Sequence, residues 1–225
     1  MDKEGAALYA EYTGLKQAPT VEKLVNFDRK LRELVENLPG DIDDETRNEH
    51  WKQIYDEMGL QLGHYGGILY SERWLREAHK LDPHSALRGY TLFSEILGER
   101  TNHRLGEMPN LEIAHKYEKE FPDGPFIEEV WSILGGFFKD LFMVLELGPE
   151  RSVYKWECYR GFISELPLKE QKENARKKAL WYYEAIVTRN PQRIEASEIK
   201  RTIEKIRNFG LVDHGYSGPW SFCAD

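Results

Sequence analysis

The chain has 225 residues, of which 40% are hydrophobic and 31% are charged, and its formal net charge is -8. This composition is enough to build an apolar core under a well-solvated surface, which argues against an intrinsically disordered chain. The acidic balance disfavours binding to nucleic acid or to an anionic membrane, because both depend on clustered lysine and arginine.

Two helices are predicted at the N-terminus, over residues 2–17 and 20–38. Thr20 stands where a side chain can cap the second helix. Phe27 occupies a position at which a close-packed helix pair has a small residue. We therefore interpret residues 2–38 as a degenerate helix pair, as terminal units of repeat proteins often are.

The clearest helix pair is predicted over residues 44–65 and 68–81, and it closes at Pro83, because proline disfavours the helical conformation in the residue before it. Later helices follow the same proline and glycine punctuation. They are expected over residues 85–98, 110–121, 125–147, 151–165 and 169–189. Residues 125–147 form either one long helix or two helices broken at Gly135 and Gly136. No run of alternating β-branched residues is present, so we expect an all-α fold with essentially no sheet.

The spacing of the prolines predicts repeated units. Pro122 and Pro191 are 69 positions apart, which is about twice a 34-residue helical repeat. We expect repeats over about residues 44–190 and a capping helix over residues 192–208, all within one domain of residues 1–225.

An irregular tail, residues 210–225, is expected after the capping helix. Its large aromatic side chains, Tyr216, Trp220 and Phe222, would form an apolar surface if they were exposed. We expect the tail to fold back on the terminal helices and to bury Trp220. The alternative is that the tail docks on another subunit.

The same residue offsets precede two of the prolines: Ser71, Leu75 and Ala78 before Pro83, and Ala179 and Tyr183 before Pro191. Upstream of the first set, an aromatic residue, an aliphatic residue, a glycine and a second large residue stand at fixed spacing: Tyr55, Met58, Gly59 and Leu62. This spacing resembles the pattern W-x2-L-G-x2-Y of the tetratricopeptide-repeat superfamily, whose second half matches the offsets before the prolines.

Residues 114–138 and 179–208 resemble tetratricopeptide proteins of the bacterial envelope, including the outer-membrane assembly lipoprotein family. In those proteins a helix ends at an aromatic residue and a proline, and a new helix begins after a short acidic turn. The corresponding residues here are Tyr117, Phe121, Pro122, Asp123, Gly124 and Pro125. The resemblance implies a right-handed superhelix of antiparallel helix pairs, a tetratricopeptide-like solenoid, that binds a peptide or protein segment on its concave face.

The family lines its concave groove with side chains of the first helix in each pair. Carried onto this sequence, the groove contains Gln53, Asp56, His64, Tyr90, Phe126 and Glu129, with Leu60 and Ile133 at neighbouring positions. The Lys and Asn clamp that captures a terminal carboxylate is absent from these positions, so that mode of binding is disfavoured. The alternative is that Leu60, Tyr90 and Phe126 pack between units. The implied function is a non-catalytic scaffold for a partner of unknown identity, in an oligomeric state that the sequence leaves open.

No catalytic or cofactor motif accompanies the repeats. None of the seven histidines pairs with another at the i, i+4 spacing of two ligands on one helical face. The best cluster is His103, Glu107 and His115, which surface or loop-capping roles explain equally well, so we expect no metal and no cofactor. The alternative function is an all-helical enzyme or metal-binding protein whose site is assembled between repeats, for example from His64, Tyr90 and Glu129.

Cys158 and Cys223 have neither zinc-site nor disulfide-framework spacing, and we expect Cys158 to be a buried, small apolar residue. The apolar residues 127–147 are interrupted by charged residues, which predicts a core helix and no membrane insertion. The residues after Met1 do not have the basic, apolar and small-residue order of a signal peptide. The expected location is therefore the cytoplasm if Met1 is the native start, and the periplasm if a signal peptide has been removed.

Overall fold

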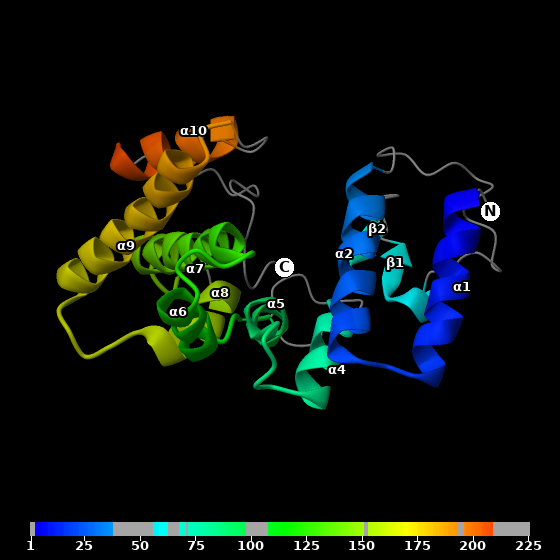
Figure 1. The fold of residues 1–225 in the computed structure, drawn as a ribbon. Coiled ribbons are helices and arrows are strands. Elements are labelled where there is room, and N and C mark those ends of the chain that lie inside the picture. Colours follow the sequence, from blue (N-terminus) through cyan, green and yellow to red (C-terminus); the bar gives the residue numbers. More distant parts are fainter. Residues whose placement is uncertain are drawn as a thin grey trace. The chain divides into compact units, whose positions relative to one another are not determined.

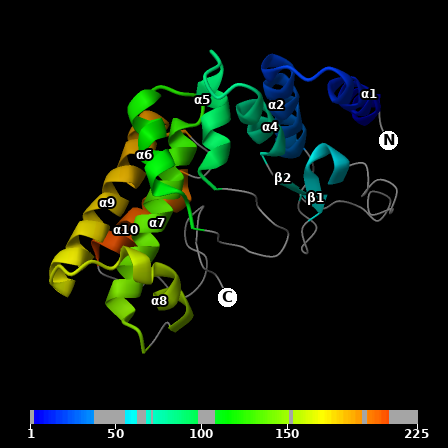
Figure 2. The same ribbon diagram turned by 90° about the horizontal axis from the view of Figure 1, so that it is seen from below.

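The computed structural model describes residues 3–37, 56–62, 68–70, 72–97, 108–150, 153–192 and 196–208. The chain divides into two compact units, Met1–Asn102 and His103–Asp225, and each is described by itself (Figures 1 and 2). The described residues of both units are mainly helical, so the all-α class is confirmed. The single continuous domain stays a prediction.

The first unit begins with two helices, α1 (Lys3–Gln17) and α2 (Val21–Asn37), joined by a short turn (Figure 1). Thr20 caps α2 as predicted, because its side-chain oxygen accepts a hydrogen bond of 3.3 Å from the backbone N–H of Lys23. A third helix, α4 (Arg73–Leu81), packs on α2. A short α-helix, α5 (Arg88–Thr91), and a 3-10 helix, η1 (Leu92–Glu95), then replace the single longer helix predicted over residues 85–98.

Trp74 connects the helices of the first unit. Its ring meets those of Tyr12 and Phe27 edge to face, with centroids 5.8 and 5.3 Å away. Its indole Nε1–H donates a hydrogen bond of 2.6 Å to the backbone oxygen of Met58. Phe27, which looks too large for a repeat position in the sequence, is fully buried in this cluster and forms part of the core.

A small sheet lies where the sequence predicts two helices. Strands β1 (Leu60–Leu62) and β2 (Ile68–Tyr70) pair in antiparallel fashion, with Leu60 opposite Tyr70. The predicted helices over residues 44–65 and 68–81 are therefore wrong at these positions. Gly59 supplies the physical reason, because its φ of 88° ends the helical turn of residues 56–58 in a conformation that favours glycine. Glu72 has a φ of 46°, and α4 begins only after it.

The second unit contains α6 (Leu111–Glu120), α7 (Ile127–Leu147), α8 (Val153–Tyr159), the 3-10 helix η2 (Arg160–Phe162), α9 (Leu168–Arg189) and α10 (Ala196–Arg207). These elements agree with the predicted helices to within a few residues, except that the predicted helix 151–165 ends earlier. Helix α7 passes through Gly135 and Gly136 without a break and packs extensively on α9. A Cβ added at Gly135 would lie 3.1 Å from the ring of Tyr183, so glycine allows this close approach.

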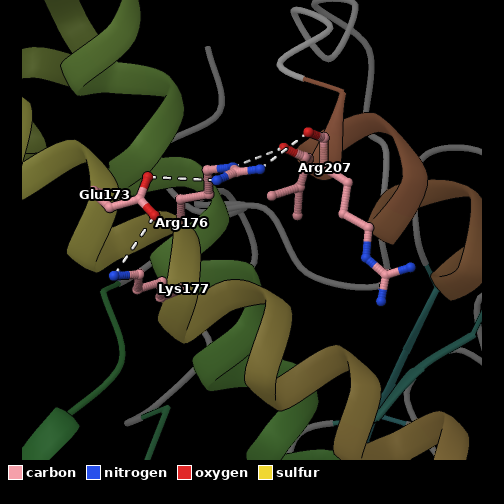
Figure 3. A network of polar contacts seen from close by, with 5 residues as sticks. Glu173, Arg176, Lys177 and Arg207 are labelled. Atoms are coloured by element: carbon pink, nitrogen blue, oxygen red, sulfur yellow. Dashed lines mark hydrogen bonds and ion pairs between the residues drawn. The ribbon is translucent and has the colours of Figure 1, made fainter.

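Helix α10 is attached to α9 through its C-terminal carbonyl groups (Figure 3). The guanidinium of Arg176 donates hydrogen bonds of 3.1 Å to the backbone oxygen of Ile206 and 3.0 Å to that of Arg207. Glu173 holds the guanidinium from one turn earlier, at 3.4 Å. Arg176 therefore satisfies carbonyl groups that have no partner within α10. The predicted capping helix is present as a helix, whereas the tail of residues 210–225 lies outside the described residues.

Three helices end in the same way. In α4, α6 and α9 the C-cap residue stands directly before a proline, and its φ angle is -153°, -130° and -136° respectively. In each helix the N–H of this cap residue donates a hydrogen bond to the carbonyl four residues earlier. The residues five and eight positions before each proline are fully buried: Ala78 and Leu75, Tyr117 and Ala114, and Ile186 and Tyr183. The recurring prolines in the sequence therefore mark a recurring local structure.

Within the described ranges, no helix combines the length and the apolar composition needed to cross a membrane. Helix α7 is the most apolar of these helices by mean hydrophobic character, yet Lys139 and Asp140 lie within it. Their burial in the second unit agrees with the prediction of a core helix for this segment.

Candidate functional site

Two of the predicted groove residues with described structure belong to the first unit. Asp56 is exposed and begins the helical turn before β1, where its backbone oxygen accepts a hydrogen bond of 3.1 Å from Gly59. Tyr90 lies in α5 and is half-buried. Gln53 and His64 lie outside the described residues.

The other two predicted groove residues belong to the second unit. Phe126 is half-buried at the cap of α7, and its N–H donates a hydrogen bond of 3.1 Å to the hydroxyl of Tyr117. Glu129 follows in the first turn of α7. Leu60 and Ile133 are fully buried, so both contribute to packing, and for Leu60 this agrees with the alternative interpretation. The four described residues are thus divided between two units, and a common groove stays a prediction.

An aromatic surface that the sequence analysis did not identify lies on α7 and α9. Trp181 has 55% of its surface exposed, which is unusual for so large an apolar side chain. Its ring meets that of Trp131 at 6.2 Å and 76°, and that of Tyr182 at 4.8 Å and 83°. We call Trp131, Trp181 and Tyr182 the tryptophan surface. Its one sequence signal is that Trp181 has charged residues three or four positions away, at Lys177, Lys178 and Glu184, on the same face of α9.

Polar contacts hold the tryptophan surface in place. Glu118 of α6 accepts a hydrogen bond of 3.0 Å from Nε1 of Trp131 and one of 3.4 Å from the hydroxyl of Tyr182. Burial, with a further contribution from Glu118, raises the pKa of Tyr182 well above its ordinary value, so the hydroxyl remains a donor. The guanidinium of Arg189 lies 5.8 Å from the ring centroid of Trp131 and forms an ion pair of 3.1 Å with Asp123. These contacts hold Trp131 and Tyr182 in place, and Trp181 packs against both of their rings.

A buried charge cluster lies in the first unit. Nε of Arg32 donates a hydrogen bond of 3.0 Å to Asp28, and Nη2 of Arg32 lies 3.9 Å from a carboxylate oxygen of Glu72. The Arg32 guanidinium also lies 4.6 Å from the ring centroid of Tyr70 and 5.7 Å from that of Phe93. One cation is therefore shared by two carboxylates and two aromatic rings.

Desolvation raises the pKa of Asp28 to about 7, and the negative charge of Glu72 adds to this, while Arg32 opposes it. A pKa near neutrality is common in active sites, where it suits proton transfer. Asp28 is only 1% exposed, however, and the backbone N–H of Leu75 in the first turn of α4 lowers its pKa by hydrogen bonding. The cluster is therefore better explained as a structural contact, in which the carboxyl group of Asp28 accepts a hydrogen bond at the N-terminus of α4, than as a catalytic acid.

The second unit has its own buried ion pair. Nζ of Lys139 lies 3.2 Å from a carboxylate oxygen of Asp140, and each side chain is 2% exposed. Tyr159 of α8 and Tyr183 of α9 are fully buried near the same carboxylate. Burial, followed by the charge of Asp140, raises the pKa of both tyrosines, so their hydroxyls are neutral at any physiological pH.

Within the part of the chain that the structure describes, no group of three or more His, Cys, Asp or Glu residues is arranged to hold a metal ion. His115 belongs to α6, where its Nδ1 lies 3.4 Å from Glu118. The other two residues of the predicted cluster, His103 and Glu107, lie outside the described residues.

The sequence analysis expects Cys158 to be a buried residue outside any disulfide, and both parts of this expectation are wrong. It is half-buried, and it is bonded in a disulfide. The spacing of two cysteines in a sequence cannot show whether folding brings them together, because a disulfide depends on the distance between Cα atoms in space.

No family model matches this chain, and no curated protein or solved structure matches it either. The tetratricopeptide relationship therefore remains a proposal that rests on the residues described above.

Proposed function

We propose that the chain is a non-catalytic scaffold of the tetratricopeptide type that binds a peptide or protein segment. The observation that carries this proposal is the common end of α4, α6 and α9, where the same cap geometry precedes a proline and the same two offsets are buried. Recurrence of one local structure is the property expected of a repeat protein, in which each unit buries its apolar face on its neighbours.

The proposed binding groove contains the exposed Asp56 and the half-buried aromatic residues Tyr90 and Phe126, with Glu129 one turn after Phe126. Gln53 and His64 complete the proposed set in sequence and lie outside the described residues. Acidic and aromatic groups together suit an extended segment that carries apolar side chains and a basic residue. The partner we propose is therefore a peptide of that chemistry.

The tryptophan surface gives a second way for the same class of partner to bind. Tryptophan is enriched among interface residues that contribute most to affinity, and rings that are already fixed lose little conformational freedom on binding. Trp181 is the side chain of this surface that a partner would reach first, because it is the most exposed.

A displayed library of random peptides tests the proposal on the purified full-length chain. We expect enrichment of peptides with apolar and basic residues. The Tyr90→Ala, Phe126→Ala double variant should weaken their binding at least about tenfold, which corresponds to about 1.4 kcal/mol. The Trp181→Ala variant tests whether the peptides bind to the tryptophan surface instead of the groove. Leu81→Ala is the control, because it removes a similarly exposed apolar side chain that belongs to neither surface. If no peptide is enriched, or if all three variants bind the enriched peptides as well as the native chain, the scaffold proposal is wrong.

A further inference from the structure

Two tyrosine hydroxyl groups are buried together inside the second unit. The side chains of Tyr159 in α8 and Tyr183 in α9 are both fully buried. Among the described residues, neither hydroxyl has a hydrogen-bond partner. Burying a hydroxyl without a hydrogen bond costs stability, and most buried polar atoms in folded proteins bond either to protein or to ordered water. Two such hydroxyls in one place therefore indicate a bound molecule that supplies the missing hydrogen bonds.

Both hydroxyls lie near the carboxylate of Asp140 in α7. After burial, the charge of this carboxylate contributes to the raised pKa of each tyrosine, and Tyr183 contributes to that of Tyr159. The Tyr159 hydroxyl faces the carboxylate, at a geometry that falls short of a direct hydrogen bond. Because such effects act over a short distance, the three groups share one small region of the interior.

Packing prevents the tyrosine rings from turning toward other partners. A Cβ added at Gly135 of α7 would lie 3.1 Å from the ring of Tyr183, so this ring already touches the helix backbone. The ring centroid of Tyr159 lies 5.4 Å from that of Phe137. The hydroxyls therefore stay where they are, and a small molecule must come to them.

The chemistry of the three groups defines what that molecule is. Each neutral tyrosine hydroxyl has a proton to donate, whereas the Asp140 carboxylate only accepts. Nζ of Lys139 lies 3.2 Å from one carboxylate oxygen. A metal ion does not suit the site, because this ammonium already balances the charge of the carboxylate. Water suits it, since one water molecule can accept two hydrogen bonds and donate others, and a buried water has two to four polar partners.

We propose that the second unit binds one long-lived water molecule between Tyr159, Tyr183 and Asp140. The water accepts a hydrogen bond from each tyrosine hydroxyl and donates one to the carboxylate. Helices α7, α8 and α9 each supply one of its partners, so the water joins α8 to the α7–α9 pair. The site lies inside the second unit, and its role does not depend on the scaffold function.

Magnetic relaxation dispersion of the solvent oxygen nuclei tests the proposal on the purified full-length chain, because its amplitude reports the number of long-lived water molecules. The Tyr159→Phe, Tyr183→Phe double variant keeps both rings and removes both hydroxyls. We expect its amplitude to fall by the contribution of one water molecule. Tyr182→Phe is the matched control, because it removes a neighbouring hydroxyl of α9 that donates directly to Glu118, and it should leave the amplitude unchanged. A native amplitude in the double variant would overturn the proposal.

Hydrogen exchange of the backbone amides of α8 and α9 distinguishes a hydroxyl that bonds to water from one that has no partner at all. Removing a partnerless hydroxyl relieves its cost and slows exchange, whereas removing a hydroxyl that bonds to water makes exchange faster. We expect the single variant Tyr183→Phe to exchange faster in both helices, by about fivefold. Continued protection of α6 shows that the unit is still folded. Slower or unchanged exchange in α8 and α9 of this variant would contradict the proposed water.

Discussion

Both compact units bury charged side chains, but their surroundings differ. In the first unit, Asp28 and Glu72 both contact the guanidinium of Arg32, and desolvation raises the pKa of Asp28. In the second unit, Lys139 and Asp140 form an ion pair in which each side chain is 2% exposed. Asp28 in the first unit is therefore an acid that titrates near neutrality. In the second unit, removing one charge of the Lys139–Asp140 pair would leave the other charge buried without it.

The comparison teaches that burial alone does not decide how a charge behaves. Asp28 can be neutralised by a proton, because desolvation raises its pKa to about 7. Burial also raises the pKa of the two tyrosines near Asp140, but these hydroxyls stay neutral throughout the physiological range. The stability of the first unit should therefore depend on pH near neutrality, whereas that of the second should depend on the integrity of its ion pair.

The largest effect is expected when the ion pair of the second unit is broken. Asp140→Ala leaves the Lys139 ammonium buried without its ion-pair partner, and we expect unfolding of the second unit to become easier by about 3–5 kcal/mol. Hydrogen exchange of α7 and α9 measures this change separately from the first unit.

A matched change at the surface serves as the control. Lys172 forms an ion pair of 3.0 Å with Glu146, whose side chain is 43% exposed. Lys172→Ala should cost no more than about 1 kcal/mol, because exposed pairs contribute little. The double variant Lys139→Met, Asp140→Leu should recover much of the loss. If Asp140→Ala costs no more than Lys172→Ala, the buried pair is not the feature that distinguishes the second unit.

The next effect is a dependence of the first unit on pH. The folded pKa of Asp28, about 7, lies above its ordinary value of 3.8. The folded state therefore binds this proton more tightly, and the resulting stabilisation is present below about pH 4 and is lost as pH rises through 7. The difference corresponds to a loss of at most about 4 kcal/mol.

Asp28→Asn checks this prediction, because an amide cannot ionise. Hydrogen exchange of α2 and α4, measured between pH 5 and 8 and corrected for the intrinsic rate, should show declining protection in the native chain and a smaller decline in the variant. Equal slopes in the two proteins would mean that Asp28 does not titrate in this interval, and the contrast between the units would lose its basis.

The sequence predicts most helix ends because their causes are local. Pro83, Pro122 and Pro191 end α4, α6 and α9 through the backbone of the residue before them, and Thr20 begins α2 through its own side chain. Such effects act within a few residues, so one sequence is sufficient to identify them.

The sheet and the polar clusters depend on partners distant in the sequence. β1 and β2 are three residues each, which is too short for an alternating pattern to distinguish them from helix. The contact of Glu118 with Tyr182 joins residues 64 positions apart, and only the packing of α6 on the other helices creates it. The residues of the proposed groove were chosen by counting along expected helices, so an error in a helix changes which residues are chosen. Leu60 is an example, because it was counted as helical but lies buried in strand β1.

The smallest effect compares a glycine from each unit. In α1, a Cβ added at Gly14 would have no heavy atom within 4 Å, whereas one added at Gly135 in α7 would lie 3.1 Å from the ring of Tyr183. Gly14→Ala should therefore stabilise the first unit by about 0.5–1 kcal/mol through helix propensity alone. Gly135→Ala gains the same propensity, but forcing Tyr183 away costs about 1–3 kcal/mol, so we expect a net loss of about 1 kcal/mol. Urea denaturation followed by circular dichroism measures both variants. A stabilised Gly135→Ala protein would show that α7 and α9 can separate without penalty, and the tight packing assigned to the second unit would then be incorrect.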